Sequence, residues 1–417
     1  MAAVDPLRAL HYDVERLGGL QDLLAPPYDV IDSAQRARLE ARSPYNVVRI
    51  DLPVGEDSYR AAARTLAQWR HEGVIVSDPG PALWPLEQTY TGPDGRERTR
   101  RGFLARARIE EYGAGRIRPH ELTHAAPKQD RLELMRATKM NLSAIFSLYA
   151  DPDGEVWRAL EPTTTGSPWA EATDDDGTAC RLWRGGNSAA HAGVRRALAD
   201  VELLIADGHH RYETARAYAE EIGGEGDHRY VLMCLVALED PGLTVFPTHR
   251  LLHGLRPDQH EALASALRRD FEIEELSDPA ALAPQAGDRI RFGYIDSHFQ
   301  RPFMLTLRSQ SIADSALAGH AEPYRRLDTA VLEALILRGA LQMADEDIDH
   351  LSMLRYARDF DEALSLVQSA ECDCAFFMAP PPMALVQAVA AAGEHMPAKS
   401  TYFYPKIPTG LLFNPVG

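Results

Sequence analysis

The residues with the clearest chemical potential are the five consecutive ones at 207–211, with the sequence DGHHR. They follow a short apolar run at 201–206, which predicts a buried strand. They precede apolar residues at helical spacing, namely Tyr212, Ala215, Ala219 and Ile222. The five residues therefore form a turn between a strand and a helix, where unpaired N–H groups and the positive end of the helix dipole favour anions. We expect this turn to bind phosphate.

Each residue type in the turn suits that role. Gly208 allows the backbone to approach a ligand closely, and Arg211 can bind a phosphate through two hydrogen bonds. His209 and His210 add donors and can carry a proton. In the alternative interpretation, Asp207 merely caps the helix and the histidines are surface residues. Three basic side chains at a helix start oppose the dipole, which costs roughly a few tenths of a kcal/mol unless an anion is present. The functional interpretation is therefore favoured.

A second cluster begins at residue 118 and contains the spacing H-E-x-x-H at His120, Glu121 and His124. On a helix this spacing binds zinc, with the glutamate as the base. Pro119 and Pro127 confine any helix here to about two turns. We therefore predict no metal site and keep a zinc-dependent hydrolase only as the least favoured alternative.

Phosphate chemistry fits this second cluster better. Glu121 stands beside His120 and shortly before Lys128 and Arg131. A carboxylate in such surroundings can act as a general base near phosphates, and the two basic residues can bind them.

Two further clusters contain donors suited to phosphate or carboxylate. His249 and Arg250 come after an apolar stretch at 230–238 and a turn at 240–242. Lys399 and Lys406 are the first and last residues of a segment near the C-terminus. Taken singly, each cluster is more often a solvated loop than a site, so both enter the prediction only as additional phosphate-binding candidates. The stiff turn at 25–29 reads as structural.

Composition and charge exclude several classes of partner. The chain has 417 residues and a formal net charge of −17, which makes it a poor general binder of nucleic acid. It has no apolar run of about 18 residues, so no membrane span is expected. Asp5, Asp13 and Glu15 stand where a signal peptide would be basic and then apolar. We expect a cytoplasmic protein whose partners are small molecules, and oligomeric state is left open.

Strand and helix patterns alternate along the chain, which predicts an α/β fold with α+β character. At about 100–200 residues per domain, the length suggests two or three domains or subdomains. We place an N-terminal α/β region at 1–102, a central nucleotide-binding region at 103–255 and a C-terminal α/β region at 256–417. The remaining expected elements are strands at 46–52, 230–238 and 374–379, helices at 58–71, 259–271, 328–341 and 383–392, a hairpin tip and outgoing strand at 91–102, and a surface excursion at 153–178.

Five segments resemble a broadly distributed prokaryotic family known as domain of unknown function ten-fifteen. They are APPYDVI at 25–31, PHELT with PKQDR at 119–131, ADGHHRYETA at 206–215, DPGLTVFPTHR at 240–250 and MPAKSTYFYPK at 396–406. The likeness extends over nearly the whole chain and supplies no activity.

The DGHHR turn is also similar to the motif of the ParB-like superfamily, which includes chromosome-partition nucleotidases, sulfiredoxin and the free-serine kinases. This likeness covers the central third of the chain and implies a serine-kinase-like subdomain there. It implies that Glu121 acts as base and that Asp207, Gly208, His209, His210 and Arg211 hold phosphates. The cysteine that sulfiredoxin needs in this turn is absent, and no DNA-binding helical module is visible.

The leading hypothesis is a kinase that uses Mg²⁺ with ATP or ADP to phosphorylate a hydroxyl of a serine-like metabolite. Glu121 accepts the hydroxyl proton, while His209, His210 and Arg211 stabilise the transferring group, since phosphoryl transfer depends on positioning and electrostatics. A nucleotide-responsive regulatory protein without transferase activity remains an open alternative.

Overall fold

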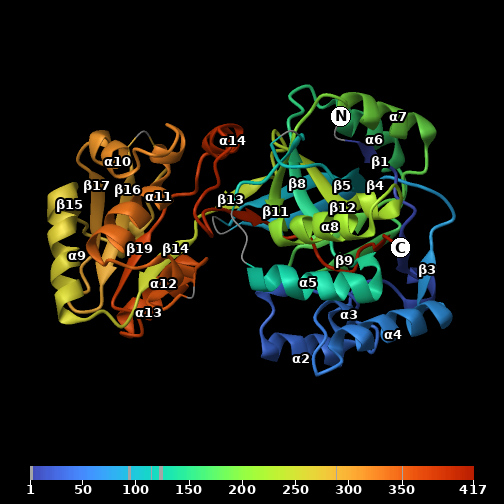
Figure 1. The fold of residues 1–417 in the computed structure, drawn as a ribbon, viewed down its shortest axis with the longest axis horizontal. Helices are drawn as coiled ribbons and strands as arrows, with labels where there is room; N and C mark the ends of the chain where they lie inside the picture. The colour runs from blue at the N-terminus through green and yellow to red at the C-terminus, as the bar shows by residue number, and fades with distance from the viewer. Residues whose placement is uncertain (1–2, 93–94, 114, 122–124, 288, 350) are drawn as a thin grey trace. The chain divides into compact units, whose positions relative to one another are not determined.

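The structure is a computed structural model that describes residues 3–417 except 93–94, 114, 122–124, 288 and 350. The chain divides into two compact units (Figure 1). Unit 1 comprises Met1–Pro119, Thr123–Thr244 and Pro405–Gly417, and unit 2 comprises His120–Leu122 and Val245–Tyr404. This division differs from the three predicted regions, because residues 102 and 103 both lie within one strand, β5 (Glu97–Arg108).

A mixed sheet forms the centre of unit 1. Its strands are β1 (Val4–Asp5), β4 (Trp84–Thr91), β5, β6 (Ile117–Arg118), β8 (Ile145–Tyr149), β9 (Ala170–Thr173), β10 (Ala179–Leu182), β11 (Leu203–Asp207) and β12 (Tyr230–Ala237). Within the described residues their order is β6-β11-β8-β12-β5-β4-β10-β9, with β1 alongside β5. β6 runs parallel to β11 and β8 runs parallel to β12, while the other pairs are antiparallel.

Helices cover the sheet of unit 1. They are α1 (Val14–Leu17), α2 (Ser33–Arg42), α3 (Val48–Asp51), α4 (Ser58–His71), α5 (Ala125–Thr138), α6 (Glu155–Leu160), α7 (Ser188–Ala197) and α8 (His209–Ile222), with short 3-10 turns η1 (Tyr28–Val30), η2 (Glu161–Thr163) and η3 (Asp227–Arg229). α8 packs against α5, and α5 packs against α4 (Figure 1). Tyr212 and Ala215 of α8 join Leu203, Ile205 and Met233 of the sheet in one buried core. This packing fixes where α8 begins.

Two short strand pairs complete unit 1. β2 (Leu10–Tyr12) pairs with β3 (Ile75–Ser77), and β7 (Met140–Asn141) pairs with β21 (Asn414–Pro415). The second pair fastens the C-terminal segment to the body of the unit.

The main sheet of unit 2 is antiparallel throughout its described strands. These are β14 (His249–Leu252), β15 (Phe271–Glu275), β16 (Arg291–Asp296), β17 (Phe303–Leu307), β18 (Leu354–Ala357) and β19 (Cys374–Phe377). Their order is β15-β17-β16-β19-β14-β18. Separately, β13 (Thr244–Phe246) pairs with β20 (Tyr402–Tyr404). The helical segments are α9 (Pro257–Asp270), α10 (Gln310–Ala316), α11 (Asp328–Leu332), α12 (Asp345–Asp349), α13 (Phe360–Gln368), α14 (Met383–Ala391), the 3-10 turns η4 (Pro279–Leu282) and η5 (Tyr324–Arg326), and the π-helix η6 (Glu333–Ala340).

The mixed α/β class predicted from the sequence is confirmed. The helix predicted at 58–71 matches α4, and the one at 259–271 matches α9 within two residues at its start. The helix predicted at 328–341 is present, although its second half has π-helical hydrogen bonding in η6. The hairpin is present as β4 and β5, with its tip at 93–94 outside the described residues. Among the described residues, no helix combines the length and apolar character that crossing a bilayer requires.

Two local predictions were wrong. Residues 46–52 contain the short helix α3 instead of a strand. Asn46 explains the difference: its amide donates to the carbonyls of Asp22 and Leu24, while its side-chain oxygen accepts the N–H of Val48 at 3.0 Å. A local side-chain bond of this kind starts a helical turn that apolar alternation cannot indicate.

The surface excursion predicted at 153–178 was also wrong in part, because the segment contains α6 and the edge strand β9. Val156 and Leu160 lie four residues apart on α6 and are both buried. The acids and turn formers around them masked this short apolar stripe.

Candidate functional site

The predicted turn at 207–211 is a strand-to-helix corner, as its sequence indicated. β11 ends at Asp207, and α8 begins at His209. Between them Gly208 has a φ of 98°, in the left-handed region that favours glycine. A Cβ atom at this position would lie only 2.9 Å from Nη2 of Arg211. The left-handed backbone therefore favours glycine here, and a side chain at this position would also displace the guanidinium of Arg211.

Asp207 does not cap the helix, which removes the alternative considered for it. Among the described residues, no side chain caps the N-terminus of α8. The carboxylate of Asp207 instead accepts hydrogen bonds from Nη2 of Arg211, at 2.6 Å, and from Nζ of Lys406. Burial alone would raise the pKa of Asp207, but the charges of Lys406 and Arg211 lower it well below its usual value. The carboxylate is therefore ionised at neutral pH.

Arg211 is almost fully buried and its direction is fixed. Its Nη1 donates to the carbonyl of Ala144 at 2.5 Å, and its Nη2 donates to Asp207. Its Nε is buried, and no described residue accepts a hydrogen bond from it. One donor of a rigid guanidinium therefore remains unused, which is uncommon for a buried group.

The two histidines of the corner differ in exposure. His209 is buried, with 6% of its surface exposed, and it adds positive potential at Asp207. His210 is half-buried. Both lie in the first turn of α8, which contains no acidic residue. The corner therefore concentrates positive potential, since the helix dipole adds to the basic side chains.

Lys406 brings the C-terminal segment to this corner within unit 1. Besides the contact between Nζ and Asp207, its carbonyl accepts a hydrogen bond from Nε2 of Gln88 at 3.0 Å. Gln88 lies on β4, in the middle of the sheet. Lys406 is therefore held at both its backbone and its side chain, and two distant motifs of the sequence meet.

A buried group of charges adjoins the corner. The guanidinium of Arg131 lies over the ring of Tyr28, 4.3 Å from its centroid, and its Nη1 donates to the carbonyl of Asp51 at 2.6 Å. Burial raises the pKa of Tyr28 to about 12, against the opposing charge of Arg211. Burial also raises the pKa of Asp51, although Arg131 and Arg211 oppose that shift. The turn at 25–31 thus contributes to the surroundings of Arg211, which the sequence did not reveal.

A small cavity of about 40 Å³ lies among these groups. Its polar lining includes Asp51, Arg131, Arg211 and Thr214. This volume holds a few water molecules at most and is too small for a nucleotide.

The predicted phosphate ligands Lys128 and Arg131 both lie on α5. Nζ of Lys128 contacts Glu213 at 2.8 Å, and this pair is partly exposed. Arg131 is buried, and its Nη2 contacts Asp130 at 2.6 Å. Lys128 is thus the more accessible of the two, and the phosphate role of both stays a prediction.

The remaining predicted residues lie in unit 2. Glu121 forms an isolated parallel bridge with Met396. Its neighbour His120 is fully buried, with Nε2 at 2.8 Å from Oγ1 of Thr401. The chain splits between Pro119 and His120. The predicted base and the predicted phosphate corner therefore belong to different units.

His249 and Arg250 are not in a solvated loop, contrary to the sequence-based expectation. They begin β14 and are buried, with 3% and 4% of their surfaces exposed. Nη2 of Arg250 donates to the carbonyls of Ala398 and Lys399 at 3.2 Å, so the segment containing Lys399 folds over it. Burial, assisted by Arg250, lowers the pKa of His249 to about 4 and keeps it neutral. All four residues of β14 are buried, which the polar types of His249 and Arg250 did not indicate.

The described part of the chain contains no group of three or more His, Cys, Asp or Glu side chains that could hold a metal ion such as zinc. His124 lies outside the described residues. The described part of the motif, His120 and Glu121, is not helical.

Three solved structures show a distant likeness to this chain. A free serine kinase variant in complex with AMP shares 13% identity, with a TM-score of 0.38, over 71% of this chain and 89% of that one. A conserved hypothetical protein from Pyrococcus furiosus shares 16%, with a TM-score of 0.36, over 70% and 90%. SbnI with a C-terminal truncation, from Staphylococcus aureus, shares 12%, with a TM-score of 0.38, over 72% and 84%.

No curated protein matches the chain. A family described as "Protein of unknown function (DUF1015)" matches residues 4–330, which include the whole DGHHR corner. That match extends over more than half of the sequence and agrees with the resemblance seen in its motifs. The protein therefore belongs to the DUF1015 family.

Proposed function

We propose that unit 1 binds the phosphates of ATP or ADP at the N-terminus of α8, and that the protein transfers a phosphoryl group to the hydroxyl of a small serine-like metabolite. One observation carries the proposal. α8 opens behind a left-handed Gly208 without a side-chain cap among the described residues, beside Arg211 and Lys406, both fixed on Asp207. An N-terminus of this kind attracts anions through its N–H groups and dipole.

The basic residues at the corner suit phosphate binding because they are held in place before a ligand arrives. Arg211 is anchored by Ala144 and Asp207, and its buried Nε has no acceptor among the described residues. His209 and His210 extend the positive surroundings along the first turn. Groups that are already oriented lose little entropy when they bind, so they can stabilise charge on a transferring phosphoryl group.

Mg²⁺ would be held at this corner mainly by the nucleotide's phosphates, because the nearby carboxylate is already paired. Asp207 is ionised, but both of its oxygens already accept hydrogen bonds from Arg211 and Lys406. Phosphate oxygens and water would therefore hold most of the ion, which is a common arrangement for Mg²⁺. When bound, the ion would neutralise negative charge on the phosphates.

Glu121 is the proposed general base that accepts the proton of the acceptor hydroxyl. A carboxylate can do so when it reaches the hydroxyl at hydrogen-bond distance. In unit 2 the bridge to Met396 holds its backbone, while its Oε1 lies 3.8 Å from Nε2 of the buried His120. Its role is independent of nucleotide affinity, which makes it testable on its own.

Calorimetric titration of the full chain with ATP and ADP, with and without Mg²⁺, tests the binding step. Arg211→Ala and His210→Ala are expected to weaken binding, with a loss of about tenfold or more for Arg211→Ala because a charge-assisted contact is removed. Arg60→Ala on α4 is the matched control, since that side chain is 82% exposed and far from the corner in sequence. Unchanged nucleotide affinity in a folded Arg211→Ala protein would remove the proposal.

Glu121→Gln tests the transfer step. We expect nucleotide binding to persist and turnover with serine-like hydroxyl compounds to fall at least about a hundredfold, a typical contribution of a general base. Mass spectrometry of the acceptor after incubation with ATP or ADP gives the readout. If nucleotide binds the wild type and no acceptor is phosphorylated, the protein belongs to the regulatory alternative and the kinase proposal fails.

A further inference from the structure

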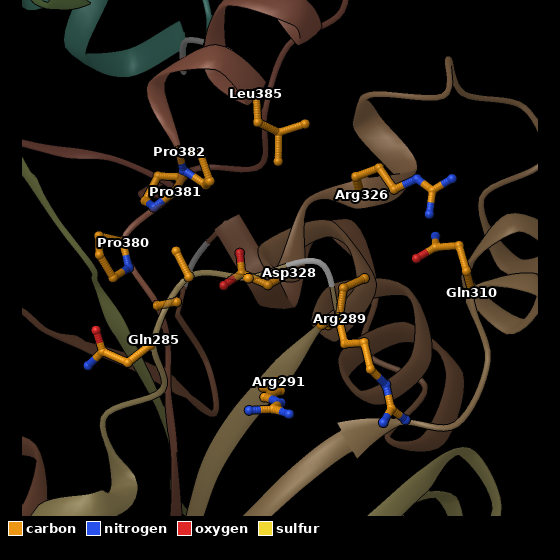
Figure 2. Close-up of a pocket in the computed structure, with 14 residues that line it drawn as sticks. Gln285, Arg289, Arg291, Gln310, Arg326, Asp328, Pro380, Pro381, Pro382 and Leu385 are labelled. Carbon is orange, nitrogen blue, oxygen red and sulfur yellow. The ribbon is translucent and has the colours of Figure 1, made fainter.

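Unit 2 contains a pocket of about 380 Å³ (Figure 2). None of the candidate phosphate-binding or catalytic residues lines it. Its lining includes Asp328, the first residue of α11. It lies at one edge of the antiparallel sheet. The start of β16 meets the ends of β17 and β19 there, because β16 runs opposite to both. The rest of the wall comes from the segment before β16 (residues 285–287 and 289), from Gln310 of α10, from Arg326 and Asp328, and from residues 379–382 with Leu385 of α14.

Three arginines surround the pocket: Arg289, Arg291 and Arg326. Nη2 of Arg289 contacts Glu272 at 3.2 Å and donates to the carbonyl of Leu307 at 3.1 Å, and Nε of Arg326 contacts Glu322 at 2.7 Å. For Arg291, no described residue supplies a hydrogen bond or an ion pair. All three are exposed. Exposed ion pairs contribute little stability, so these guanidinium groups can turn to an incoming anion at low cost.

Asp328 is the acidic group of the pocket, and Figure 2 shows its carboxylate at the centre of the labelled residues. It accepts the N–H of Thr329 at 2.7 Å, and no described cation forms an ion pair with it. Burial raises its pKa to about 6, although Arg250 opposes that shift. A desolvated carboxylate without a contact cation gains stability when a ligand brings one.

The opposite wall is apolar and rigid. Pro380, Pro381 and Pro382 line it together with Leu385, and Figure 2 shows the prolines facing Asp328. Proline has no N–H group, so this wall offers no backbone donor to an anion. Ligand charges would therefore be recognised on the arginine side, and the volume falls within the range of small-molecule sites.

We propose that this pocket binds an α-amino acid that carries a second anionic group, with its ammonium on Asp328 and its acidic groups on Arg289, Arg291 and Arg326. A simple carboxylate would leave Asp328 without a cation, and a simple amine would leave three guanidinium groups without an anion. The second anionic group is a carboxylate or a phosphate, since arginine binds both through paired hydrogen bonds. This site lies within unit 2 and does not depend on nucleotide binding in unit 1.

Calorimetric titration of the full chain with four probes tests the ligand class. L-glutamate and O-phospho-L-serine contain all the required groups, glutarate lacks the ammonium, and L-glutamine lacks the second anion. We expect one or both of the first two to bind at least about tenfold more tightly than glutarate and glutamine. The comparison of glutamate with phosphoserine distinguishes carboxylate from phosphate. Equal affinity for glutamate and glutarate, or no binding by any probe, would overturn the proposal.

Two variants locate the binding. Arg291→Gln is expected to weaken the better ligand about tenfold or more, since one guanidinium contact is lost. Asp328→Asn is expected to abolish the preference for glutamate over glutarate. Arg301→Gln is the matched control, because that arginine of unit 2 is exposed, pairs with Glu275 and does not line the pocket. An unchanged affinity in Arg291→Gln, whose exposed side chain should not affect folding, contradicts the assignment even if Asp328→Asn is unstable. Titration with ATP in the same proteins separates this result from the nucleotide site.

Discussion

Two partly buried aspartates, one in each unit, have pKa values that are shifted in opposite directions. Asp207 in unit 1 has a pKa below the usual range because Lys406 and Arg211 contact its two oxygens. Asp328 in unit 2 has a pKa raised to about 6, since burial outweighs the influence of Arg250. Both carboxylates are desolvated, so the difference lies in whether a cation is in contact.

This difference suggests distinct roles for the two regions. In the corner around Asp207 the carboxylate is paired with two cations that it holds in place, which suits a site that must hold its donors in fixed directions. The pocket around Asp328 contains unmatched charge of both signs, which suits a site completed by a charged ligand. Removing a cation from Asp207 should therefore lower the stability of unit 1. Replacing the acid Asp328 with a neutral residue should raise the stability of unit 2.

The largest effect is expected for Lys406→Met. The change removes one of the two cations on Asp207 and should lower the free energy of unfolding by about 3 kcal/mol, because it leaves a buried carboxylate partly uncompensated. Urea denaturation measures the loss. Lys128→Met is a suitable control, since its pair with Glu213 is partly exposed. A loss below about 1 kcal/mol would show that Asp207 depends little on Lys406.

Asp328→Asn should raise the free energy of unfolding. The pH dependence of this gain shows whether it comes from the ionisation of Asp328. The folded pKa of about 6 lies above the usual value of 3.8, so ionisation opposes folding as pH rises between these values. At pH 7 the variant should be more stable by on the order of 2 kcal/mol, and the gain should vanish below about pH 4. For Asp207, whose pKa is lowered, we expect the reverse. Its ionised carboxylate stabilises the folded protein above the pKa of the unfolded state, and this stabilisation is lost as pH falls. Thermal unfolding of both proteins from pH 3.5 to 7 checks the sign. A difference that does not change with pH would contradict it.

Gly208→Ala is expected to cost about 1–2 kcal/mol, since left-handed backbone is unfavourable for alanine. The new Cβ would also displace Arg211, so nucleotide affinity should fall with stability. Gly154→Ala is the matched control: its φ is 65°, and no atom lies within 4 Å of the added Cβ. Denaturation and nucleotide titration of both variants separate backbone strain from the contact with Arg211. Equal nucleotide affinity in the two variants would remove the steric argument.

The smallest effect on stability is expected for Lys128→Ala. Its partly exposed pair with Glu213 should contribute no more than about 0.5 kcal/mol to unfolding. The nucleotide titration is the more informative measurement, because a loss of affinity without a loss of stability would support a direct phosphate contact. If neither quantity changes, Lys128 is removed from the proposed site.

The sequence revealed the corner better than its surroundings. Residues 201–222 carry a strand pattern, a glycine and a helical pattern in direct succession, and such local signals predicted β11, the turn and α8. Asn46 accepts the N–H of Val48 locally and also donates to the distant carbonyls of Asp22 and Leu24, so the helix that it starts could not be inferred from alternation.

The site shows the same limit. The types of Asp207, Arg211 and Lys406 indicated phosphate chemistry, but no pattern indicated that the acid would bind both cations. His249 and Arg250 read as a solvated loop because buried arginine is rare, and the carbonyls of residues 398 and 399 that hold Arg250 lie far away in the sequence. The arginines around Asp328 come from separate segments, which only the folded sheet brings together.

The return of the chain to unit 1 at residues 405–417 has a consequence for its synthesis. Lys406 contacts Asp207, and Nδ2 of Asn414 donates to Oδ1 of Asn141 at 2.7 Å, so residues 405–417 complete a unit whose other segments are synthesised earlier. Unit 2, in contrast, is complete once residue 404 has been synthesised. A nascent polypeptide stalled before residue 405 should therefore protect residues 245–404 from protease while the phosphate corner is still unformed.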